Sequence, residues 1–379
     1  MASFHQVESN LDEIAAPSPI YDPSEQPVRR EEEERARLLP PTLCTLGYLV
    51  FFSIAGTLLR VAVESLTFYP GTPLNTSVVW ANVGGSVVMG FLSEDKKLFM
   101  DNTGPAGKKS IPLYIGLTTG FCGSFTSFST FIRDAFLALS NDLSVPVVQV
   151  PSAPNGGFSF MALLAVLFTE IGLSLAGLML GAHLALAVQR WTPRLPRWIY
   201  TVLDPLVVIL AVLAWVAVIC LAVLLGESGQ NSTLWSSTTW RGPVLYALAL
   251  SPPGCLARFF LSMELNGRLA SFPLGTFAAN SGGTAILGMA YALQHSTAGG
   301  SGIIPCQVLQ GVMDGFCGCL TTVSTWVLEL SGLRRRHAYF YGGASVLIGL
   351  CLLIVEIGSL KWSIGLATPA CFDPVKTEY

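Results

Sequence analysis

The strongest constraint in this sequence is a twelve-residue stretch that occurs twice. It reads GFCGSFTSFSTF over 120–131 and GFCGCLTTVSTW over 315–326, so the copies are 195 residues apart (315 minus 120). Each copy places glycines, then hydroxyl side chains, then aromatic rings in an otherwise apolar stretch. Glycine weakens a helix and a buried hydroxyl needs a partner, so a plain membrane helix avoids this mixture. The repetition predicts a chain made of two related units.

The duplication extends upstream of each copy. Arg60 precedes Asn82 by 22 residues, and Arg258 precedes Asn280 by the same interval (82 minus 60; 280 minus 258). Each asparagine is followed by a Gly-Gly pair and then by a single glycine, Gly90 or Gly288. The same residue types in the same order favour a true internal repeat over coincidence.

The composition places both units in a membrane. Of the residues 51% are hydrophobic and 12% are charged, whereas soluble domains carry about 25% charged residues. A crossing helix needs about 20 apolar residues. The sequence therefore predicts an all-α integral membrane protein with nine transmembrane helices, near 43–65, 74–92, 111–139, 158–189, 198–226, 243–265, 272–294, 303–331 and 338–364.

Loop charges orient these spans. Lys and Arg gather in 93–110, 190–197 and 332–337 and are absent from 140–157 and 295–302. Because basic loops face the cytoplasm, the N-terminus is expected in the cytosol and the C-terminus outside. The span at 198–226 then starts the second unit on the opposite side, which predicts inverted four-helix repeats joined by a linker helix.

The expected organisation has five parts, and the polar N-terminal tail is expected to be disordered and cytosolic. These parts are the tail 1–40, the first repeat 41–190, the linker 191–240, the second repeat 241–365 and the C-terminal tail 366–379. The sequons at Asn75 and Asn231 fall outside the membrane in this arrangement. The formal net charge of −3, without a basic patch, gives no indication of nucleic-acid binding. Nine cysteines without regular spacing predict no disulfide framework, and four distant histidines predict no metal site.

The polar residues of the first two helices of each repeat allow two interpretations. Arg60 and Arg258 either form positive vestibules that concentrate anions, or reach the interface and pair with Glu64 and Glu264. Asn82 and Asn280 either donate to an anion in a pore or make a hydrogen bond between helices. Their duplication beside Gly-Gly favours the pore.

The repeated motif predicts a broken third helix in each repeat. A break at mid-membrane frees carbonyl groups, which suits a small cation when two breaks face each other. Phe128 and Phe131 share a helix face, and their electropositive ring edges can face an anion. The hydroxyls of Ser129, Thr130, Ser324 and Thr325 add donors. Core packing of the aromatic pair is the alternative.

At this point the sequence resembles a known family. Arg in the first helix, Asn with Gly-Gly in the second, and Gly-x-x-Gly-x-x-Thr-[Ser/Thr]-x-Ser-Thr-aromatic in the third resemble the Fluc/CrcB fluoride channels. The duplicated single chain resembles their eukaryotic form, the fluoride exporter (FEX) of fungi and plants. The resemblance covers roughly 43–365 and implies a passive, fluoride-selective channel at the plasma membrane that exports fluoride and confers resistance, without enzymatic activity.

The resemblance also implies a site. Fluoride would pass Asn82, Asn280 and the Phe128–Phe131 pair, and backbone carbonyls would hold a central structural sodium ion, from Gly123, Thr126, Gly318 and Thr321. Its partners would be fluoride and the bilayer, and a single chain would form the whole channel as a monomer.

The second half departs from the family pattern. Val323 and Trp326 stand where the first half has Phe128 and Phe131. Pairing across the halves would give one pore Phe128 with Trp326 and leave the other with Val323 and Phe131. This predicts unequal pores, the second being impaired.

Two carboxylates within apolar spans support a competing function. Glu170 or Glu356 could couple proton movement to export of cationic drugs, as in small multidrug antiporters, or could be structural. A membrane enzyme is disfavoured, because the sequence shows no cluster of His, Asp or Cys at an interface.

Overall fold

A computed structural model describes most of the chain. The described residues are 39–67, 69, 72, 74, 76–99, 107–143, 156–228, 241–296 and 302–371. Nearly all of the predicted N-terminal tail, the asparagines of both sequons and the last eight residues lie outside them. From Pro41 onward the chain forms one compact unit, so the two repeats are not separate bodies.

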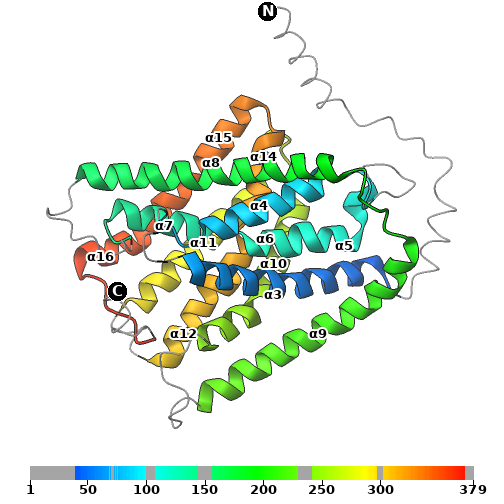
Figure 1. The fold of residues 1–379 in the computed structure, drawn as a ribbon. Helices are drawn as coiled ribbons and strands as arrows, with labels where there is room; N and C mark the ends of the chain where they lie inside the picture. The colour runs from blue at the N-terminus through cyan, green and yellow to red at the C-terminus, as the bar shows by residue number, and fades with distance from the viewer. Residues whose placement is uncertain are drawn as a thin grey trace, which may run out of the picture. The chain divides into compact units, whose positions relative to one another are not determined.

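The described chain is helical throughout, without a strand (Figure 1). In the first half and linker the elements are α3 (Pro41–Thr67), α4 (Val79–Glu94), η1 (Gly107–Ser110), α5 (Pro112–Ile115), η2 (Gly116–Cys122), α6 (Gly123–Phe125), α7 (Phe128–Leu139), α8 (Gly156–Val188) and α9 (Arg197–Ser228). In the second half they are α10 (Arg241–Leu265), α11 (Leu274–Gln294), α12 (Ile303–Gly311), η3 (Val312–Cys317), α13 (Gly318–Leu320), α14 (Ser324–Gly332), α15 (Arg335–Leu353), η4 (Ile354–Gly358) and α16 (Ser359–Ser363).

Six of the described helices are long and apolar enough to cross a membrane. They are Pro41–Thr67, Gly156–Val188, Ile199–Leu224, Gly242–Leu265, Ile303–Gly332 and Arg335–Ser363. This establishes an all-helical, multi-pass membrane protein. Three further expected spans coincide with α4, with the segment from α5 to α7, and with α11, and these do not reach the same measure of length and apolar character. α4, with 16 residues, is shorter than the roughly 20 of a standard span.

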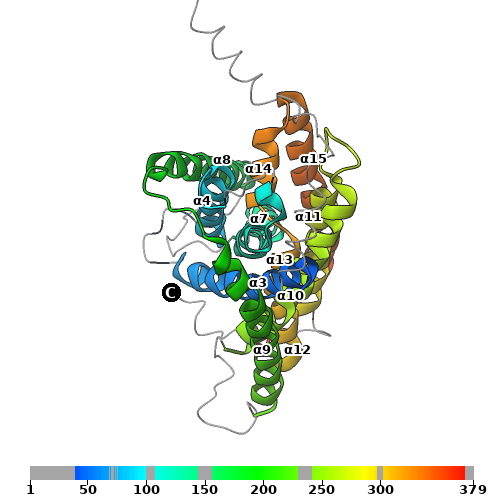
Figure 2. The same cartoon turned by 90° about the vertical axis from the view of Figure 1, so that its right-hand side faces the viewer.

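The two halves interlock around their third segments. α7 of the first half packs against α11 and α15 of the second, and α14 of the second half packs against α4 and α8 of the first. Viewed almost along α7, the other helices surround it (Figure 2). Each third segment thus completes the packing of the opposite half, which is why the repeats form one unit.

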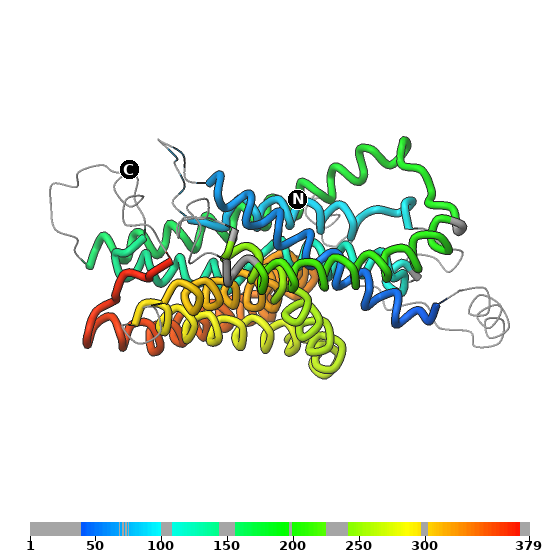
Figure 3. Tube along the Cα trace, turned by 90° about the horizontal axis from the view of Figure 1, so that it is seen from below, coloured from blue at the N-terminus to red at the C-terminus, as the bar shows by residue number. Residues whose placement is uncertain are grey.

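The linker helix α9 packs against α3, which it crosses in the tube view (Figure 3), and also contacts α10. The Tyr48 hydroxyl donates to the Asp204 carboxylate at 3.2 Å, and Trp215 Nε1 donates to the carbonyl of Ala249 at 2.9 Å. A Cβ at Gly47 would touch Val208, so the absence of a side chain there permits close approach. α9 is therefore joined to the first helix of each half.

α4 and α8 approach so closely that their backbones meet at glycine. A Cβ at Gly90 would overlap the carbonyl of Leu178, and one at Gly181 would overlap the carbonyl of Val87. Small residues permit such packing in membranes, where no hydrophobic force drives helices together. Gly90 and Gly181 therefore allow α4 and α8 to pack at backbone contact distance.

The basic loop after α4 folds back on that helix. Lys108 donates to the carbonyls of Leu92, Ser93 and Asp95, at 3.3, 2.5 and 3.0 Å, and so caps the C-terminal end of α4. Partial burial lowers the pKa of Lys108, because desolvation disfavours the charged ammonium.

The cysteines include one pair that the sequence did not predict. Cys306 in α12 is disulfide-bonded to Cys371, which lies in the C-terminal tail. The other seven cysteines form no disulfide. Their irregular spacing hid a bond that joins residues 65 positions apart. The sequence predicted no disulfide framework, and this single bond had not been identified.

Candidate functional site

Both third segments are broken, as the repeated motif predicted. The first helix ends at Phe125, Thr126 is extended (φ −99°, ψ 149°), and helix resumes at Phe128. In the second half the helix ends at Leu320, Thr321 is extended (φ −95°, ψ 155°), and helix resumes at Ser324. The two breaks are equivalent under the 195-residue shift (321 minus 126), so the broken third helix is confirmed in each half.

The breaks cross and bind each other through their threonines. Thr126 Oγ1 accepts hydrogen bonds from the amides of Val323 and Ser324, both at 3.2 Å. Thr321 Oγ1 accepts a hydrogen bond from the amide of Ser129 at 3.1 Å. Each threonine therefore receives the free amides that start the opposite helix, as an N-cap side chain does within one helix. This reciprocal exchange fixes the two halves to each other at the centre of the unit.

The two asparagines hold the breaks from within their own halves. Asn82 Oδ1 accepts from the amide of Ser127 at 2.9 Å, and Asn280 Oδ1 accepts from the amide of Thr322 at 2.8 Å. Both side chains are buried. The hydrogen bond between helices, which was the structural alternative, is thus present in both halves, and the pore role of each asparagine stays a prediction.

The amide nitrogens of the two asparagines have different partners. Asn82 Nδ2 donates to the Glu170 carboxylate at 2.9 Å. Asn280 Nδ2 donates to the carbonyl of Thr322 at 3.1 Å. One side of the crossing thus contains a buried carboxylate beside its asparagine, and the other has a neutral carbonyl in that role.

Several carbonyl groups at the breaks lack the amide that would bond them in a continuous helix, among them those of Gly123, Thr126, Gly318 and Thr321. The amides four residues after Gly123 and Gly318 donate to Asn82 and Asn280. Those after Thr126 and Thr321 donate to side-chain hydroxyls, Thr130 N to Ser127 at 3.3 Å and Thr325 N to Thr322 at 3.4 Å. These are the four carbonyl groups predicted to hold a cation.

Such carbonyl groups fit a sodium ion. Unwound backbone at a helix break supplies neutral oxygen ligands for Na⁺ in membrane proteins, and irregular backbone within a membrane needs some partner for its polar groups. Among the described residues no cluster of His, Cys, Asp or Glu suits a metal instead. Neutral carbonyl oxygens are a ligand type suited to a sodium ion, and the ion itself stays a prediction.

The arginines lie inside the crossing. The Arg258 guanidinium donates to the carbonyls of Cys319 and Thr119, both at 2.8 Å, and Arg60 donates to the carbonyl of Asp314. Positions 119 and 314 are also 195 apart (314 minus 119). They lie in the π-helical turns η2 and η3. Such turns interrupt the regular backbone hydrogen bonding of an α-helix. Each arginine therefore donates to a carbonyl in the π-helical turn of the opposite half.

The two arginines lie deeper in the protein than either the vestibule or the interface interpretation expects. A Cβ at Gly123 would overlap the Arg258 guanidinium, and one at Gly318 would overlap that of Arg60. Both arginines are buried, with 0% of Arg60 and 2% of Arg258 exposed. Among the described residues no ion pair joins either arginine to Glu64 or Glu264, but Arg60 and Glu64 interact electrostatically, so the pairing alternative stays a hypothesis. The structure shows backbone contacts for both, and the vestibule role stays a prediction.

The aromatic side chains gather beside the breaks. The rings of Phe128 and Trp326 are 5.2 Å apart and those of Phe128 and Phe131 are 5.6 Å apart, both edge to face. Phe128 lies against Gly349, and Trp326 lies near Gly342, both on α15. The expected contact between Phe128 and Trp326 is present, and α15 covers both rings.

The four predicted hydroxyl donors are all engaged within the protein. Ser129 Oγ lies 3.0 Å from Thr321 Oγ1, and Thr130 Oγ1 lies 2.8 Å from Ser127 Oγ. Ser324 donates to the carbonyl of Cys122 at 3.1 Å, and Thr325 accepts from Thr322 at 3.5 Å. Sequence reasoning missed Ser127 and Thr322, whose hydroxyls accept hydrogen bonds from backbone amides in the first turns of the helices after the breaks. Their hydroxyls, repeated at the 195-residue shift, were the available signal.

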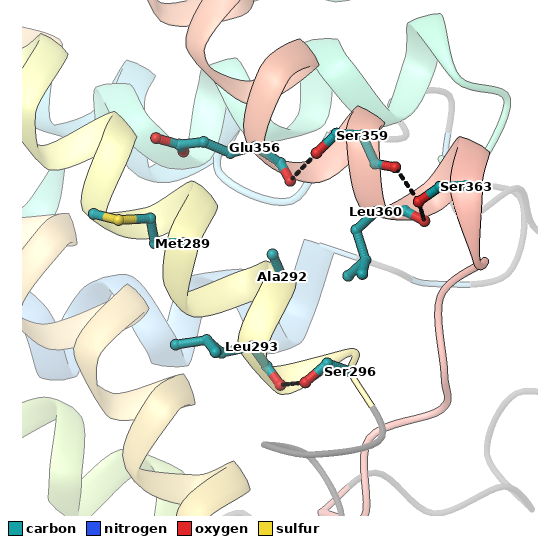
Figure 4. Close-up of a pocket in the computed structure, with 8 residues that line it drawn as sticks. All are labelled: Met289, Ala292, Leu293, Ser296, Glu356, Ser359, Leu360 and Ser363. Atoms are coloured by element: carbon teal, nitrogen blue, oxygen red, sulfur yellow. Dashed lines mark hydrogen bonds between the residues drawn. The ribbon is translucent and has the colours of Figure 1, made fainter.

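Glu356 lies apart from the crossing. It lines an open cavity of about 570 Å³ between α11 and the segment η4–α16, as Figure 4 shows. The serines of this cavity, Ser296, Ser359 and Ser363, donate to carbonyls of their own helices. Neither Glu170 nor any predicted pore residue lines this cavity. Glu356 and Glu170 therefore do not belong to one site.

Comparison with known proteins is consistent with this geometry. Residues 48–182 and 245–358 match the family described as CrcB-like protein, Camphor Resistance (CrcB). The chain is 48% identical to Fluoride export protein 1 of Neurospora crassa, over 90% of this chain and 71% of that protein. It is 39% identical to Fluoride export protein 1 of Candida albicans, over 84% and 80%.

A bacterial relative matches a single repeat. The fluoride-specific ion channel FluC of Pseudomonas aeruginosa is 35% identical over 33% of this chain and 98% of its own length. The two separate family matches and this short relative agree with a duplicated unit. No solved structure is significantly similar to the chain.

Proposed function

The chain belongs to the CrcB-like protein family, and we propose that it is a passive, fluoride-selective channel that exports fluoride from the cytosol across the plasma membrane. Its relatives are fluoride export proteins and a fluoride channel, that is, transporters rather than enzymes. The observation that carries the proposal is the crossing of two broken helices, rich in uncharged donors, in both family-matching segments.

The proposed topology has nine crossings and two inverted repeats. α9 separates the halves and adds one crossing, which reverses the direction of the second set. The distribution of Lys and Arg among the loops supports a cytosolic N-terminus and an extracellular C-terminus. Accessibility labelling of single cysteines in the loops before α5 and before α12 tests this: opposite sides support inversion, and the same side contradicts it.

The crossing supports selective and passive movement of a small anion. Asparagine amides, hydroxyls and ring edges can replace water around fluoride without the tight binding of a fixed cation. An inside-negative potential drives an anion outward by about 2.3 kcal/mol per charge per 100 mV. The channel therefore needs no coupled energy source.

A sodium ion at the crossing completes the proposal. The carbonyl groups of Gly123, Thr126, Gly318 and Thr321 would hold it, and its charge would satisfy the backbone that the breaks leave open. One chain supplies both breaks, which supports a channel that works as a monomer.

The two sides of the crossing differ, which supports unequal pathways. On the side formed by α4, α8 and α14, Asn82 donates to Glu170, and a carboxylate beside the route would repel fluoride. On the side formed by α7, α11 and α15, Asn280 has a neutral partner, and both Phe128 and Trp326 lie against α15. We expect the Asn280 side to conduct and the Asn82 side to be impaired.

Fluoride tolerance tests the function. Cells lacking their fluoride exporter should fail to grow at fluoride concentrations that cells expressing this protein survive. Asn280→Asp should abolish rescue, because a carboxylate replaces the donor, and Asn82→Asp should reduce it less. Absence of rescue by the correctly inserted wild-type protein would remove the proposal.

The second candidate is a proton-coupled exporter that uses Glu170 or Glu356. Each of these glutamates has one carboxylate oxygen without a hydrogen-bond partner, and the deeper burial of Glu170 favours it over Glu356. Transport by such a protein stops when the proton gradient is dissipated, whereas fluoride movement through a channel continues and follows the membrane voltage.

A further inference from the structure

The last described residues of the chain are fastened to the second half. Cys371 is bonded to Cys306 in α12, and the backbone amide of Cys371 lies 3.2 Å from the Cys306 sulfur. Four residues earlier, the amide of Ala367 donates to the carbonyl of His295, just after α11, at 2.7 Å. The segment 364–371, which follows α16, is therefore held by both α11 and α12. We call this segment the C-terminal strap.

A buried glutamine joins the same elements. Gln294, the last residue of α11, donates to the carbonyl of Cys306 at 3.0 Å and to the Gln310 side chain at 3.1 Å. Its Nε2 also lies 3.9 Å from the Cys371 sulfur. Both Gln294 and Cys306 are buried. The disulfide thus lies within a packed, hydrogen-bonded junction of α11, α12 and the strap, and is not a loose link between exposed loops.

The location of this junction indicates its side of the membrane. The loop 295–302, which joins α11 to α12, carries no Lys or Arg, and such loops tend to lie outside the cytoplasm. Disulfides persist in oxidising compartments and are rare in the cytosol. Loop charge and cysteine pairing are independent properties, and both point to the same side.

We propose that Cys306 and Cys371 form a permanent structural disulfide on the non-cytosolic side, and that it makes the C-terminal strap a covalent tie between the last span and the second broken helix. The free cysteines Cys220 and Cys351 are exposed on membrane-spanning helices and have no such partner. The bond forms as the chain enters the secretory lumen. Two thiols lose two protons and two electrons, and the disulfide of a luminal thiol oxidoreductase is reduced to its dithiol.

The tie acts on the elements that hold the second break. α12 continues through η3 and α13 to Thr321, and α11 carries Asn280, which receives the amide of Thr322. The strap contacts the C-terminal end of α11 and the N-terminal part of α12. We expect loss of the bond to lower the stability of the second half more than that of the first.

Counting thiols tests whether the bond exists. The chain has nine cysteines. Protein unfolded and alkylated without reduction should carry seven labels, and reduced protein nine, by intact mass. Cys306→Ser should give eight labels under both conditions, because its former partner is freed. Nine labels on the unreduced wild-type protein, purified with free thiols blocked at lysis, would overturn the proposal.

Two further measurements test the side and the role. In Cys306→Ser, a membrane-impermeant maleimide applied to intact cells should label the freed and partly exposed Cys371; labelling only after lysis would place it in the cytosol and refute the assignment. Cys306→Ser, Cys371→Ser and the double variant should lower the melting temperature equally, since all remove the same bond, while Cys351→Ser should not. Additive losses, or no loss, would refute the tie. None of these readouts depends on fluoride transport.

Discussion

Replacing Thr126 by valine tests the reciprocal contact between the breaks. Valine keeps the volume and removes the hydroxyl. The Thr126 hydroxyl accepts from the amides of Val323 and Ser324 and donates to the carbonyl of Cys122 at 3.0 Å. Thr126 is fully buried, so water cannot replace these bonds.

The expected magnitude follows from the number of amides left without a partner. Each buried polar group without a partner costs about 1–3 kcal/mol, so Thr126→Val should destabilise the protein by about 2–6 kcal/mol. Thr321→Val leaves one such amide, that of Ser129, and should cost about half as much, about 1–3 kcal/mol. The difference in destabilisation between the two variants therefore follows from the number of amides that each threonine accepts across the crossing.

Thr284→Val is the matched control. Thr284 is equally buried, and its hydroxyl donates only to the carbonyl of Asn280 within its own helix, at 2.7 Å. Its loss leaves no amide without a partner. Thermal unfolding of the purified protein in detergent, with fluoride efflux from vesicles, compares the three variants. The reasoning is refuted if Thr126→Val melts at the same temperature as Thr284→Val and keeps its full efflux.

Three further results are expected. Phe128→Ala should reduce fluoride efflux at least tenfold, and Val323→Ala should change it little, because only Phe128 belongs to the pathway that retains both rings; equal effects would contradict unequal pathways. Gly123→Ala should destabilise the protein, because its methyl group would displace the Arg258 guanidinium, whereas Gly282→Ala should be tolerated because its Cβ position is open; similar melting temperatures would contradict the packing. Replacing sodium on both sides by a large organic cation should lower efflux and melting temperature together, and neither change would be seen without a cation at the four carbonyl groups.

The sequence predicted the breaks well because their cause is local. Glycine and hydroxyl residues inside an apolar stretch disfavour a continuous helix, and the same letters recur 195 residues later. That a break frees carbonyl groups follows from the break itself, whereas the choice of Gly123, Thr126, Gly318 and Thr321 came from the family resemblance. These features depend on neighbouring residues and need no knowledge of how the halves meet.

The arginine contacts could not be predicted in this way. Arg60 reaches a carbonyl 254 residues away, and Arg258 reaches one 139 residues away. Only the packing of the two halves brings each arginine to its carbonyl group. Every residue has a backbone carbonyl, so the sequence cannot indicate which one accepts. The glycines that accommodate the guanidinium groups were visible, but they also had a sufficient explanation in the breaks.

Two other contacts were missed for similar reasons. The bond between Asn82 and Glu170 joins α4 to α8 across 88 residues, and neither residue indicates its partner. The Cys306–Cys371 bond was hidden among nine cysteines, most of which form no disulfide. Cys371 alone lies outside the expected spans, and Cys306 falls within the span expected over 303–331, so the sequence did not bring the two together.

Fluoride efflux from vesicles that contain only the purified protein tests the central proposal most directly. With potassium and valinomycin setting the voltage, and a protonophore removing any proton gradient, a fluoride electrode should record efflux that grows with the inside-negative potential, while chloride stays trapped. Efflux no faster than from protein-free vesicles, or efflux that stops when the protonophore is added, would contradict a passive fluoride channel.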